Sequence, residues 1–178
     1  MHILTIEIET PLGLMIGGAT EKGVCFIEFT DRVKLDRELE RLKSELNAAA
    51  VVPGENIHLI QLKQELDDYF ERRRTTFDVK LHLTGTPFQQ SVWKALCDIP
   101  YGKTWSYKQQ AIHMNNLMGI RAIAAANGQN KHAIVIPCHR VIGSNGNLTG
   151  YAGGLPKKDW LLKFEGTVYT PELPFGEF

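Results

Sequence analysis

Hydrophobic and polar residues alternate along the first part of the chain, the pattern of strands that bury one face. Three such runs lie at HILTIEIET (2–10), GLMIGGAT (13–20) and GVCFIEF (23–29), with turns at 11–13 and 21–23 between them. Turns this short join antiparallel neighbours. We therefore predict an antiparallel meander in which Cys25 is a core residue.

Helical periodicity follows the alternation. Leucines recur every three or four residues among charges in 34–50 and again in 57–74, and Pro53 with Gly54 separates the two stretches. Alternation returns in FDVKLHLT (77–84), which predicts a further strand before TGTP interrupts the pattern. These features predict an N-terminal α/β domain over residues 1–85.

The next stretch of the chain is predominantly helical in pattern. In PFQQSVWKALCDI (87–99), helical periodicity places Phe88, Val92, Leu96 and Ile99 on one stripe. Trp93 and Cys97 lie beside this stripe. Two shorter helical patterns, 106–114 and 120–130, flank the connector NNLMG, a helix-turn-helix spacing that many antiparallel helix pairs share. We predict a mainly helical C-terminal domain over 86–166 and a tail over 167–178.

The helix predicted at 120–130 has a surface of small side chains. Arg121 near its start is its single long cation, and the small residues along it are Ala122, Ala124, Ala125 and Ala126. A thin helix of this kind could lie against a groove or pack closely on a neighbouring helix, and the pattern alone fits both.

Charge is unevenly distributed, although the formal net charge of the 178 residues is zero. Residues 1–85 hold 11 Lys and Arg against 15 Asp and Glu, a net charge of −4, whereas residues 86–166 hold 9 against 3, a net charge of +6. Glu172 and Glu177 in the tail restore the balance. A basic half favours an anionic partner, nucleic acid first, although lysines that contact only solvent would give the same count.

Composition excludes several classes of protein. No apolar run approaches the roughly 18 residues of a membrane span, and the opening segment carries Glu7 and Glu9, so it is neither a signal peptide nor an anchor. The three cysteines, Cys25, Cys97 and Cys138, are widely spaced without a C-x-x-C pair, which argues against a disulfide framework and a zinc knuckle. We expect a cytoplasmic protein that makes no membrane contact.

The stretch VIPCHRVIG (135–143) carries the strongest chemical signal. Pro137 cannot continue a strand, so Cys138 is expected where an apolar run ends in a turn. A cysteine attacks as the thiolate and needs a base or a positive charge beside it, which His139 and Arg140 can supply. The alternative is a buried thiol next to a histidine with an ordinary structural role.

A histidine base needs a carboxylate to fix its tautomer. The basic half offers Asp98, Asp159 and Glu165, of which Glu165 ends the helical pattern WLLKFEG. A carboxylate buried there requires a partner, whereas one at a solvated helix end does not. If the backbone is extended at Cys138, the thiol and His139 point to opposite faces, and a water or a turn must link them.

The glycine-rich stretch GSNGNLTGYAGG (143–154) suits a loop that lines a pocket, with Tyr151 as its aromatic residue. No G-K-[ST] follows it, so it is not a phosphate-binding loop. The sequence also lacks the H-E-x-x-H, EF-hand and G-x-S-x-G patterns.

Six blocks, in this order along the chain, are GTPFQQSVWKAL, IPYGKTWSY, IRAIAAANGQN, IPCHRVIG, LTGYAGG and WLLKFEG. Together they resemble the O6-alkylguanine-DNA alkyltransferases, also called methylated-DNA–protein-cysteine methyltransferases, over nearly the whole chain. The resemblance implies an α/β two-domain fold: an N-terminal antiparallel sheet with helices, ribonuclease H-like, and a mainly helical C-terminal domain with a helix-turn-helix. It also implies DNA repair by stoichiometric, irreversible transfer of an alkyl group from guanine O6, with O4-alkylthymine as a second candidate substrate, to Cys138.

The same resemblance assigns the chemistry to Cys138, His139, Glu165, Tyr107 and Asn130, without metal or cofactor. Glu165 would orient His139, which takes the thiol proton through a water before the thiolate attacks the alkyl carbon. The Tyr107 hydroxyl would hydrogen-bond the flipped purine and help to neutralise the guanine anion as it leaves. Asn130 would brace the turns near the cysteine.

The implied partner is double-stranded DNA, bound through the minor groove by a monomer, with the alkylated nucleotide flipped out of the stack. Arg121 would fill the vacated space while Ala122 approaches the groove. The other implied DNA contacts are Tyr107, Lys108 and Ser144, and the implied pocket residues are Val141, Gly150, Tyr151 and Ala152. Some relatives carry a serine where this chain has Ala152, so one hydrogen bond to the base is missing here.

Some relatives hold a structural zinc ion in the first domain through two cysteines and two histidines. Only Cys25 and His82 match two such positions here, so we predict no zinc. Two rival hypotheses remain: a lesion-binding protein whose cysteine is incidental, and a Cys-His-Glu hydrolase, which would turn over. Only the transferase hypothesis predicts the covalent gain of one alkyl group at Cys138.

Overall fold

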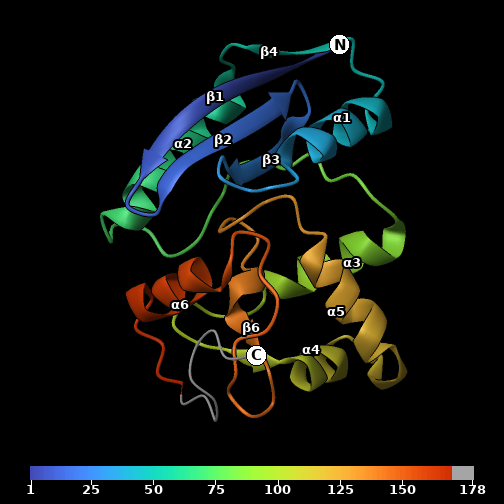
Figure 1. Ribbon diagram of the computed structural model, residues 1–178, viewed down its shortest axis with the longest axis vertical. Coiled ribbons are helices and arrows are strands. Elements are labelled where there is room, and N and C mark those ends of the chain that lie inside the picture. Colours follow the sequence, from blue (N-terminus) through green and yellow to red (C-terminus); the bar gives the residue numbers. More distant parts are fainter. Residues whose placement is uncertain (170–178) are drawn as a thin grey trace. The chain divides into compact units, whose positions relative to one another are not determined.

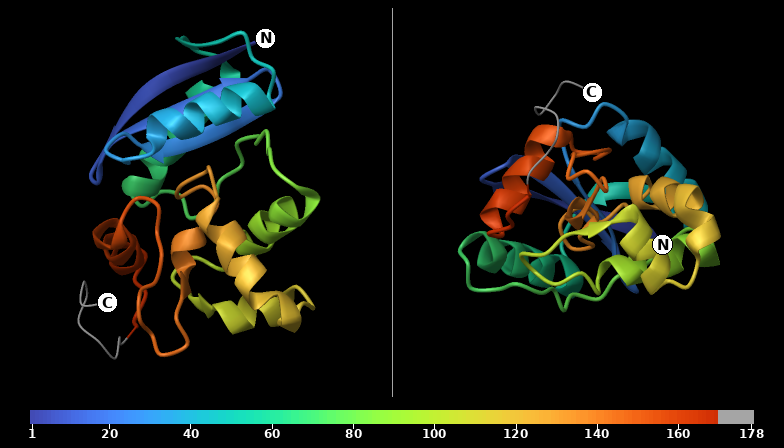
Figure 2. Two further views of the ribbon diagram at one scale, coloured as in Figure 1. Left: turned by 45° about the vertical axis from the view of Figure 1, so that its right-hand side comes forward. Right: turned by 90° about the horizontal axis from the view of Figure 1, so that it is seen from below.

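The computed structural model describes residues 1–169, and residues 170–178 of the predicted tail lie outside the described part. The residues fall into two compact units, drawn as ribbons in Figures 1 and 2. Unit 1 comprises Met1–Gly85 and Lys131–Val135, and unit 2 comprises Thr86–Asn130 and the residues from Ile136 onward. Within residues 1–169, no helix is both long and apolar enough to cross a membrane.

Unit 1 is built on a four-stranded sheet in the order β3-β2-β1-β4. Its strands are β1 (His2–Thr10), β2 (Gly13–Thr20), β3 (Gly23–Phe29) and β4 (Ala50–Pro53). The first three pair antiparallel, with Ile8 opposite Met15, so the predicted meander is confirmed. β4 pairs parallel with β1, whereas the sequence pattern extends a helix to residue 50.

Two helices cover opposite faces of this sheet (Figure 1). They are α1 (Leu35–Glu45) and α2 (Ile57–Phe70). On one face Leu42 of α1 packs in a core cluster with Ile3 and Cys25, which confirms Cys25 as a core residue. On the other face α2 approaches so closely that a Cβ on Gly17 would lie 2.9 Å from the side chain of Leu62.

Both helices are shorter than their sequence patterns. Asn47, just after α1, adopts a left-handed φ of 50°, a conformation that ends helices and tolerates asparagine. This turn frees the following residues to form β4. At the start of α2, the Asn56 side chain accepts a hydrogen bond from the Leu59 N–H at 3.0 Å and caps the helix.

The predicted strand at 77–84 is wrong. Only Leu81 forms a bridge, parallel to Val24 of β3. The N–H groups of Asp78 and Val79 instead donate to the buried Glu65 carboxylate, at 2.9 and 3.1 Å. A side chain of α2 therefore takes the donors that a neighbouring strand would otherwise use, so the segment stays irregular.

Unit 2 combines helices with a small parallel sheet. Its helices are α3 (Pro87–Leu96), α4 (Tyr107–His113), α5 (Ile120–Gly128) and α6 (Leu155–Phe164), its 3-10 helices are η1 (Leu117–Gly119) and η2 (Cys138–Arg140), and its strands are β5 (Trp105–Ser106) and β6 (Val141–Ile142). Capping boxes begin α3, at Thr86 and Gln89, and α4, at Ser106 and Gln109.

The pair α4 and α5, joined through η1, is the predicted helix-turn-helix element. Gln110 of α4 and Asn127 of α5 exchange two buried side-chain hydrogen bonds, at 2.9 and 2.7 Å, which fix the helices against each other. Trp93 of α3 donates to the Ala126 carbonyl at 2.8 Å and ties α3 to the same pair.

The predicted stripe of α3 is only partly correct. Val92, Leu96 and Ile99 are buried. Phe88, in the first turn of the helix, is 37% exposed. Cys97 is also exposed, because the helix ends at Leu96 and Cys97 lies at its cap, off the packed face.

Candidate active site around Cys138

Tight turns, with no extended strand, lead the chain into Cys138. The Cys138 N–H donates to the Ile136 carbonyl at 2.8 Å, and Pro137 between them has φ −82° and ψ 60°. These angles and this bond define an inverse γ-turn. Cys138 then begins η2, so the chain turns at Cys138, as the sequence predicts, and is not extended there.

Asn130 holds this turn from the end of α5. Its buried side-chain amide donates to the Ile136 carbonyl at 2.9 Å, so that carbonyl accepts two hydrogen bonds. Asn130 therefore contacts the turn that presents Cys138, where the resemblance places it.

His139 is fully buried and meets Glu165, the residue that caps the C-terminus of α6. The His139 Nε2 lies 2.9 Å from Glu165 Oε1. Arg140 donates two hydrogen bonds to the same carboxylate, Nε to Oε1 at 2.8 Å and Nη2 to Oε2 at 2.9 Å. Its Nη1 donates to the Ile99 carbonyl. Of the three acids considered from the sequence, the structure brings Glu165 to the histidine.

The electrostatics of this cluster fix its protonation. Burial raises the pKa of Glu165, but hydrogen bonds from Arg140 and His139 outweigh it and bring the pKa to about 2. Burial lowers the pKa of His139, and the neighbouring Glu165 offsets only part of this effect. Glu165 is therefore a carboxylate and His139 a neutral imidazole near pH 7.

A neutral His139 that donates from Nε2 to Glu165 keeps its lone pair on Nδ1. Nδ1 is buried and has no hydrogen-bond partner within residues 1–169. An unprotonated ring nitrogen of this kind can act as a general base. The arrangement can take one proton from a thiol, directly or through a water.

Lys158 is a site residue that the sequence pattern did not single out. The residue is 1% exposed, and its ammonium group donates to three carbonyls, those of Val141 at 2.6 Å, Thr149 at 2.9 Å and Gly150 at 3.3 Å. Burial lowers the pKa of Lys158 to about 8, and the negative charge of a Cys138 thiolate raises it in opposition. Its place in the helical period was the available signal, because it shares a face with Leu161 and Leu162.

Tyr107 meets the same loop from the first turn of α4. Its hydroxyl donates to the Thr149 carbonyl at 3.2 Å and lies 3.0 Å from Thr149 Oγ1. Burial raises the pKa of Tyr107, the hydrogen bond with Thr149 opposes the rise, and the charge of Cys138 adds to it. Tyr107 and Lys158 thus share the Thr149 carbonyl, and the charge of Cys138 acts on the pKa of both side chains.

The other predicted pocket and DNA-binding residues lie on the surface of unit 2, in β6 or in the loop after β6. Exposed on α4, α5 and this loop are Lys108, Arg121, Ala122, Ser144, Gly150 and Ala152. Val141 is buried and Tyr151 half-buried. Ile123 and Ala126 bury the opposite side of α5, which leaves its Arg121 side open.

Residues 1–169 contain no group of three or more His, Cys, Asp or Glu side chains placed to hold a metal ion. The two residues compared with zinc ligands have other contacts. The Cys25 thiol donates to the Gly18 carbonyl at 3.4 Å, and His82 Nδ1 lies 2.8 Å from the Thr20 hydroxyl.

Glu165 is expected to make the protein less stable in acid. Its pKa is about 2 in the folded protein against an ordinary value of 4.5, so its contribution is complete above pH 4.5 and is lost as the pH falls towards 2. The difference corresponds to roughly 3 kcal/mol of unfolding free energy. The lowered pKa of His139 acts in the same direction, because protonation of the buried ring favours unfolding as the pH falls.

Urea unfolding between pH 7 and pH 3 measures this contribution. The wild type should lose more stability on acidification than Glu165→Gln, whereas Glu9→Gln, which changes an exposed carboxylate on β1, should follow the wild type. The same acid sensitivity in all three proteins would contradict the assignment.

Both units have known relatives. Residues 3–83 match the family model described as 6-O-methylguanine DNA methyltransferase, ribonuclease-like domain, and residues 87–167 match the one described as its DNA binding domain. A methylated-DNA–protein-cysteine methyltransferase of Methanosarcina barkeri is 42% identical over 161 residues, which cover 89% of this chain and 94% of that protein. One from Salmonella typhimurium is 39% identical over 178 residues, with 93% and 97% covered.

The fold is similar to that of Mycobacterium tuberculosis OGT, solved in complex with DNA. The TM-score is 0.76 at 35% sequence identity, with 93% of this chain and 92% of that chain covered. This likeness confirms the predicted two-domain α/β fold class.

Proposed function

Because the chain belongs to the family of methylated-DNA–protein-cysteine methyltransferases, we propose that it repairs DNA by taking the alkyl group of O6-alkylguanine onto its own Cys138. One observation carries the proposal: beside Cys138, a buried neutral His139 donates to Glu165 from Nε2 and keeps a free lone pair on Nδ1. This is the arrangement that a cysteine nucleophile requires.

The proposed reaction is a displacement at the alkyl carbon. His139 Nδ1 takes the proton of the Cys138 thiol through a water, and Glu165 stabilises the imidazolium that forms. The Sγ–carbon bond forms as the carbon–O6 bond breaks, and the electron pair leaves with the guanine. The departing anion gains one proton from the Tyr107 hydroxyl, and the tyrosinate regains a proton through solvent as the His139 imidazolium gives up the one that it took from the thiol. Every atom of the balance comes from the protein, water and the alkylated base, so no cofactor is consumed.

The surface of unit 2 supplies the proposed DNA contacts. Arg121 enters the stack from the start of α5, and Ala122 lies against the minor groove. Lys108 and Ser144 contact the backbone of the DNA. The flipped base occupies a pocket formed by Val141, Gly150, Tyr151 and Ala152. We assign DNA binding and alkyl acceptance to residues 86–166, the N-terminal α/β domain to residues 1–85, and action as a monomer in the cytoplasm.

The count of lesions repaired tests this function. With alkylated duplex in excess, loss of O6-methylguanine should stop at one lesion per protein molecule, because the thioether on Cys138 is not reversed. Continued turnover would indicate a Cys-His-Glu hydrolase. Duplex that is bound but keeps all its lesions would indicate a lesion-binding protein.

Arg121→Ala is expected to slow transfer from duplex DNA by about 10- to 100-fold, because the variant cannot fill the space that the flipped nucleotide leaves. Reaction with free benzylguanine, which needs no flipping, should stay within about twofold of the wild type. Single-turnover rates with both substrates measure the ratio.

Lys94→Ala is the matched control for charge, since Lys94 is an exposed cation on α3, a different helix from that of Arg121. It should change both rates little at moderate salt. Equal losses for Arg121→Ala with duplex and with free base would argue against an intercalating role.

A further inference from the structure

Ile134, four residues before Cys138, has a backbone conformation that isoleucine rarely adopts. Its φ is 70°, in the left-handed region, where a β-branched side chain is a clear outlier. The Val135 N–H donates to the Ala133 carbonyl at 2.8 Å across it. This three-residue loop is the γ-turn with positive φ, the rare and strained member of its class.

Ile134 differs from the other residues with positive φ. The remaining non-glycine examples in residues 1–169 are Asn47, Arg72 and Asn115. Each of them follows the end of a helix, where a left-handed residue is common. Ile134 follows no helix and is 1% exposed. Its conformation therefore has to be imposed by what holds the chain on either side.

The upstream side is held by unit 1. Ile27 of β3 donates to the Lys131 carbonyl at 2.9 Å and accepts from the Ala133 N–H at 3.0 Å. His132 Nε2 lies 3.0 Å from the Val24 carbonyl of the same strand. Residues 131–133 are thus paired with β3 and cannot shift freely.

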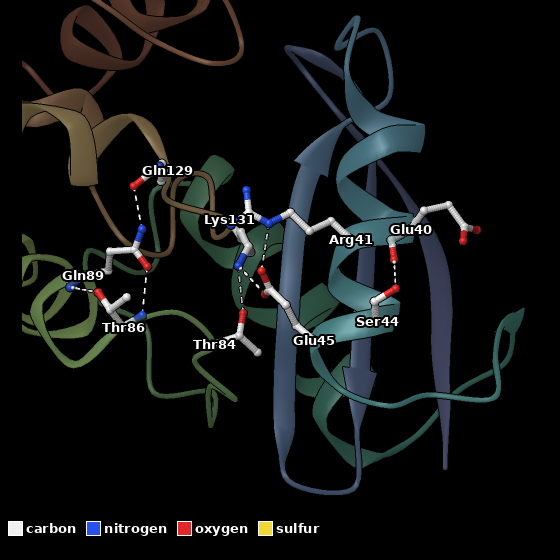
Figure 3. A network of polar contacts seen from close by, with 9 residues as sticks. All are labelled: Glu40, Arg41, Ser44, Glu45, Thr84, Thr86, Gln89, Gln129 and Lys131. Atoms are coloured by element: carbon white, nitrogen blue, oxygen red, sulfur yellow. Dashed lines mark hydrogen bonds and ion pairs between the residues drawn. The ribbon is translucent and has the colours of Figure 1, made fainter.

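Lys131 adds a side-chain clamp to this pairing (Figure 3). Its ammonium group donates to Glu45 of α1 at 3.1 Å and to the Thr84 hydroxyl at 2.8 Å. Arg41 holds the same Glu45 carboxylate at 3.0 Å. The last residues before the turn are therefore fixed through both backbone and side chain.

Hydrogen bonds also hold the chain downstream of Ile134. The Ile136 carbonyl accepts bonds from Asn130 and from the Cys138 N–H. Only two residues separate it from Ala133, the last residue paired with β3. A tight turn at Ile134 joins the two fixed segments, and strain persists where the surroundings over-determine the backbone.

We propose that Ile134 is a positioning residue for alkyl transfer: its strained γ-turn, which follows the segment paired with β3, fixes the course of the chain into Cys138 and so where the thiol meets the alkyl carbon. This inference rests on the proposed function. Misalignment of a nucleophile by about 1 Å can slow a reaction by about 100-fold. The turn therefore acts on alignment and leaves the intrinsic reactivity of the thiol unchanged.

Ile134→Gly and Ile134→Ala form the test, because both delete the buried side chain but only glycine accepts a positive φ without strain. We expect Ile134→Gly to unfold at a higher urea concentration than Ile134→Ala, the reverse of the usual order. We also expect it to transfer methyl from saturating duplex about tenfold more slowly than Ile134→Ala, because its turn no longer fixes Cys138. The two variants should agree within about twofold in their affinity for the duplex. They should also agree within about twofold in the rate at which Cys138 reacts with iodoacetamide, a reaction that needs no alignment with DNA.

A second pair of variants loosens the clamp from outside the turn. Glu45→Gln weakens the ion pair between Glu45 and Lys131 and should slow methyl transfer. The substitution removes no cation that DNA could contact, so slower transfer would result from the weakened ion pair. Glu40→Gln changes an exposed carboxylate on the same helix and should transfer like the wild type. This pair keeps the proposal testable if a variant at Ile134 does not fold.

Equal transfer by the glycine and alanine variants, a glycine variant less stable than the alanine variant, or unchanged transfer in Glu45→Gln would overturn the role of Ile134. A wild-type protein that accepts no methyl group would overturn the proposed function itself. The two failures are distinguishable, since the first requires an active wild type.

Discussion

Cys138→Ser is expected to abolish methyl uptake, with the single-turnover rate lowered by roughly 1000-fold or more, because a serine hydroxyl stays protonated where a cysteine forms a thiolate. The affinity for alkylated duplex should change by less than about twofold, since the substitution replaces one atom and no DNA contact. Quenched-flow transfer and a gel-shift titration measure the two quantities.

Cys97→Ser is the matched control for this substitution. Cys97 is exposed and donates its thiol hydrogen to the Trp93 carbonyl at 3.6 Å, and serine can make the same bond. Its transfer rate should equal that of the wild type. Methyl uptake that persists in Cys138→Ser and disappears in Cys97→Ser would identify Cys97 as the acceptor.

Lys158→Met is expected to slow transfer by about 100-fold. The substitution keeps the length of the buried side chain but removes the ammonium group that ties the Val141 carbonyl to those of Thr149 and Gly150. It also removes the positive charge near the Cys138 thiolate. Two measurements separate these effects: the transfer rate, and the pH midpoint of Cys138 alkylation by iodoacetamide.

The pH midpoint should move upward in Lys158→Met, because a thiolate without a nearby cation forms at higher pH. Lys157→Met is the control, since Lys157 is the preceding residue of α6 and its ammonium group donates to the Gly153 carbonyl at 3.4 Å, outside the set of carbonyls that Lys158 binds. An unchanged midpoint in Lys158→Met would reduce the role of Lys158 to holding the loop.

Local patterns predict much of this fold. Alternation identifies β1, whose side chains face core and solvent in turn. Every residue of β3 is buried, because helices cover both faces of the sheet (Figure 1). Helix starts are equally local: Thr86 with Gln89 and Ser106 with Gln109 form capping boxes within four residues of sequence. The chemistry of the P-C-H-R block singles out Cys138 and His139, but the pattern leaves Asp98, Asp159 and Glu165 open as the carboxylate, and the contact between His139 Nε2 and Glu165 Oε1 decides between them.

Long-range hydrogen bonds decide what the patterns miss. FDVKLHLT alternates like a strand, yet Glu65 of α2 takes two of its N–H groups. Lys158 looks like one of two exposed lysines until its three carbonyl partners are in place. Residues 131–135 lie within the sequence of the second domain, but pairing with Ile27 and Val24 brings them to unit 1. None of these partners is visible in a window of neighbouring residues.

Intact-mass spectrometry of the protein after incubation with a duplex carrying O6-methylguanine tests the central claim most directly. We predict a gain of one methyl group per molecule, saturating at that value, and peptide mapping that places it on the peptide containing VIPCHR. An unchanged mass with duplex binding intact would contradict the account, because Cys138 would then be chemically silent beside its histidine and carboxylate.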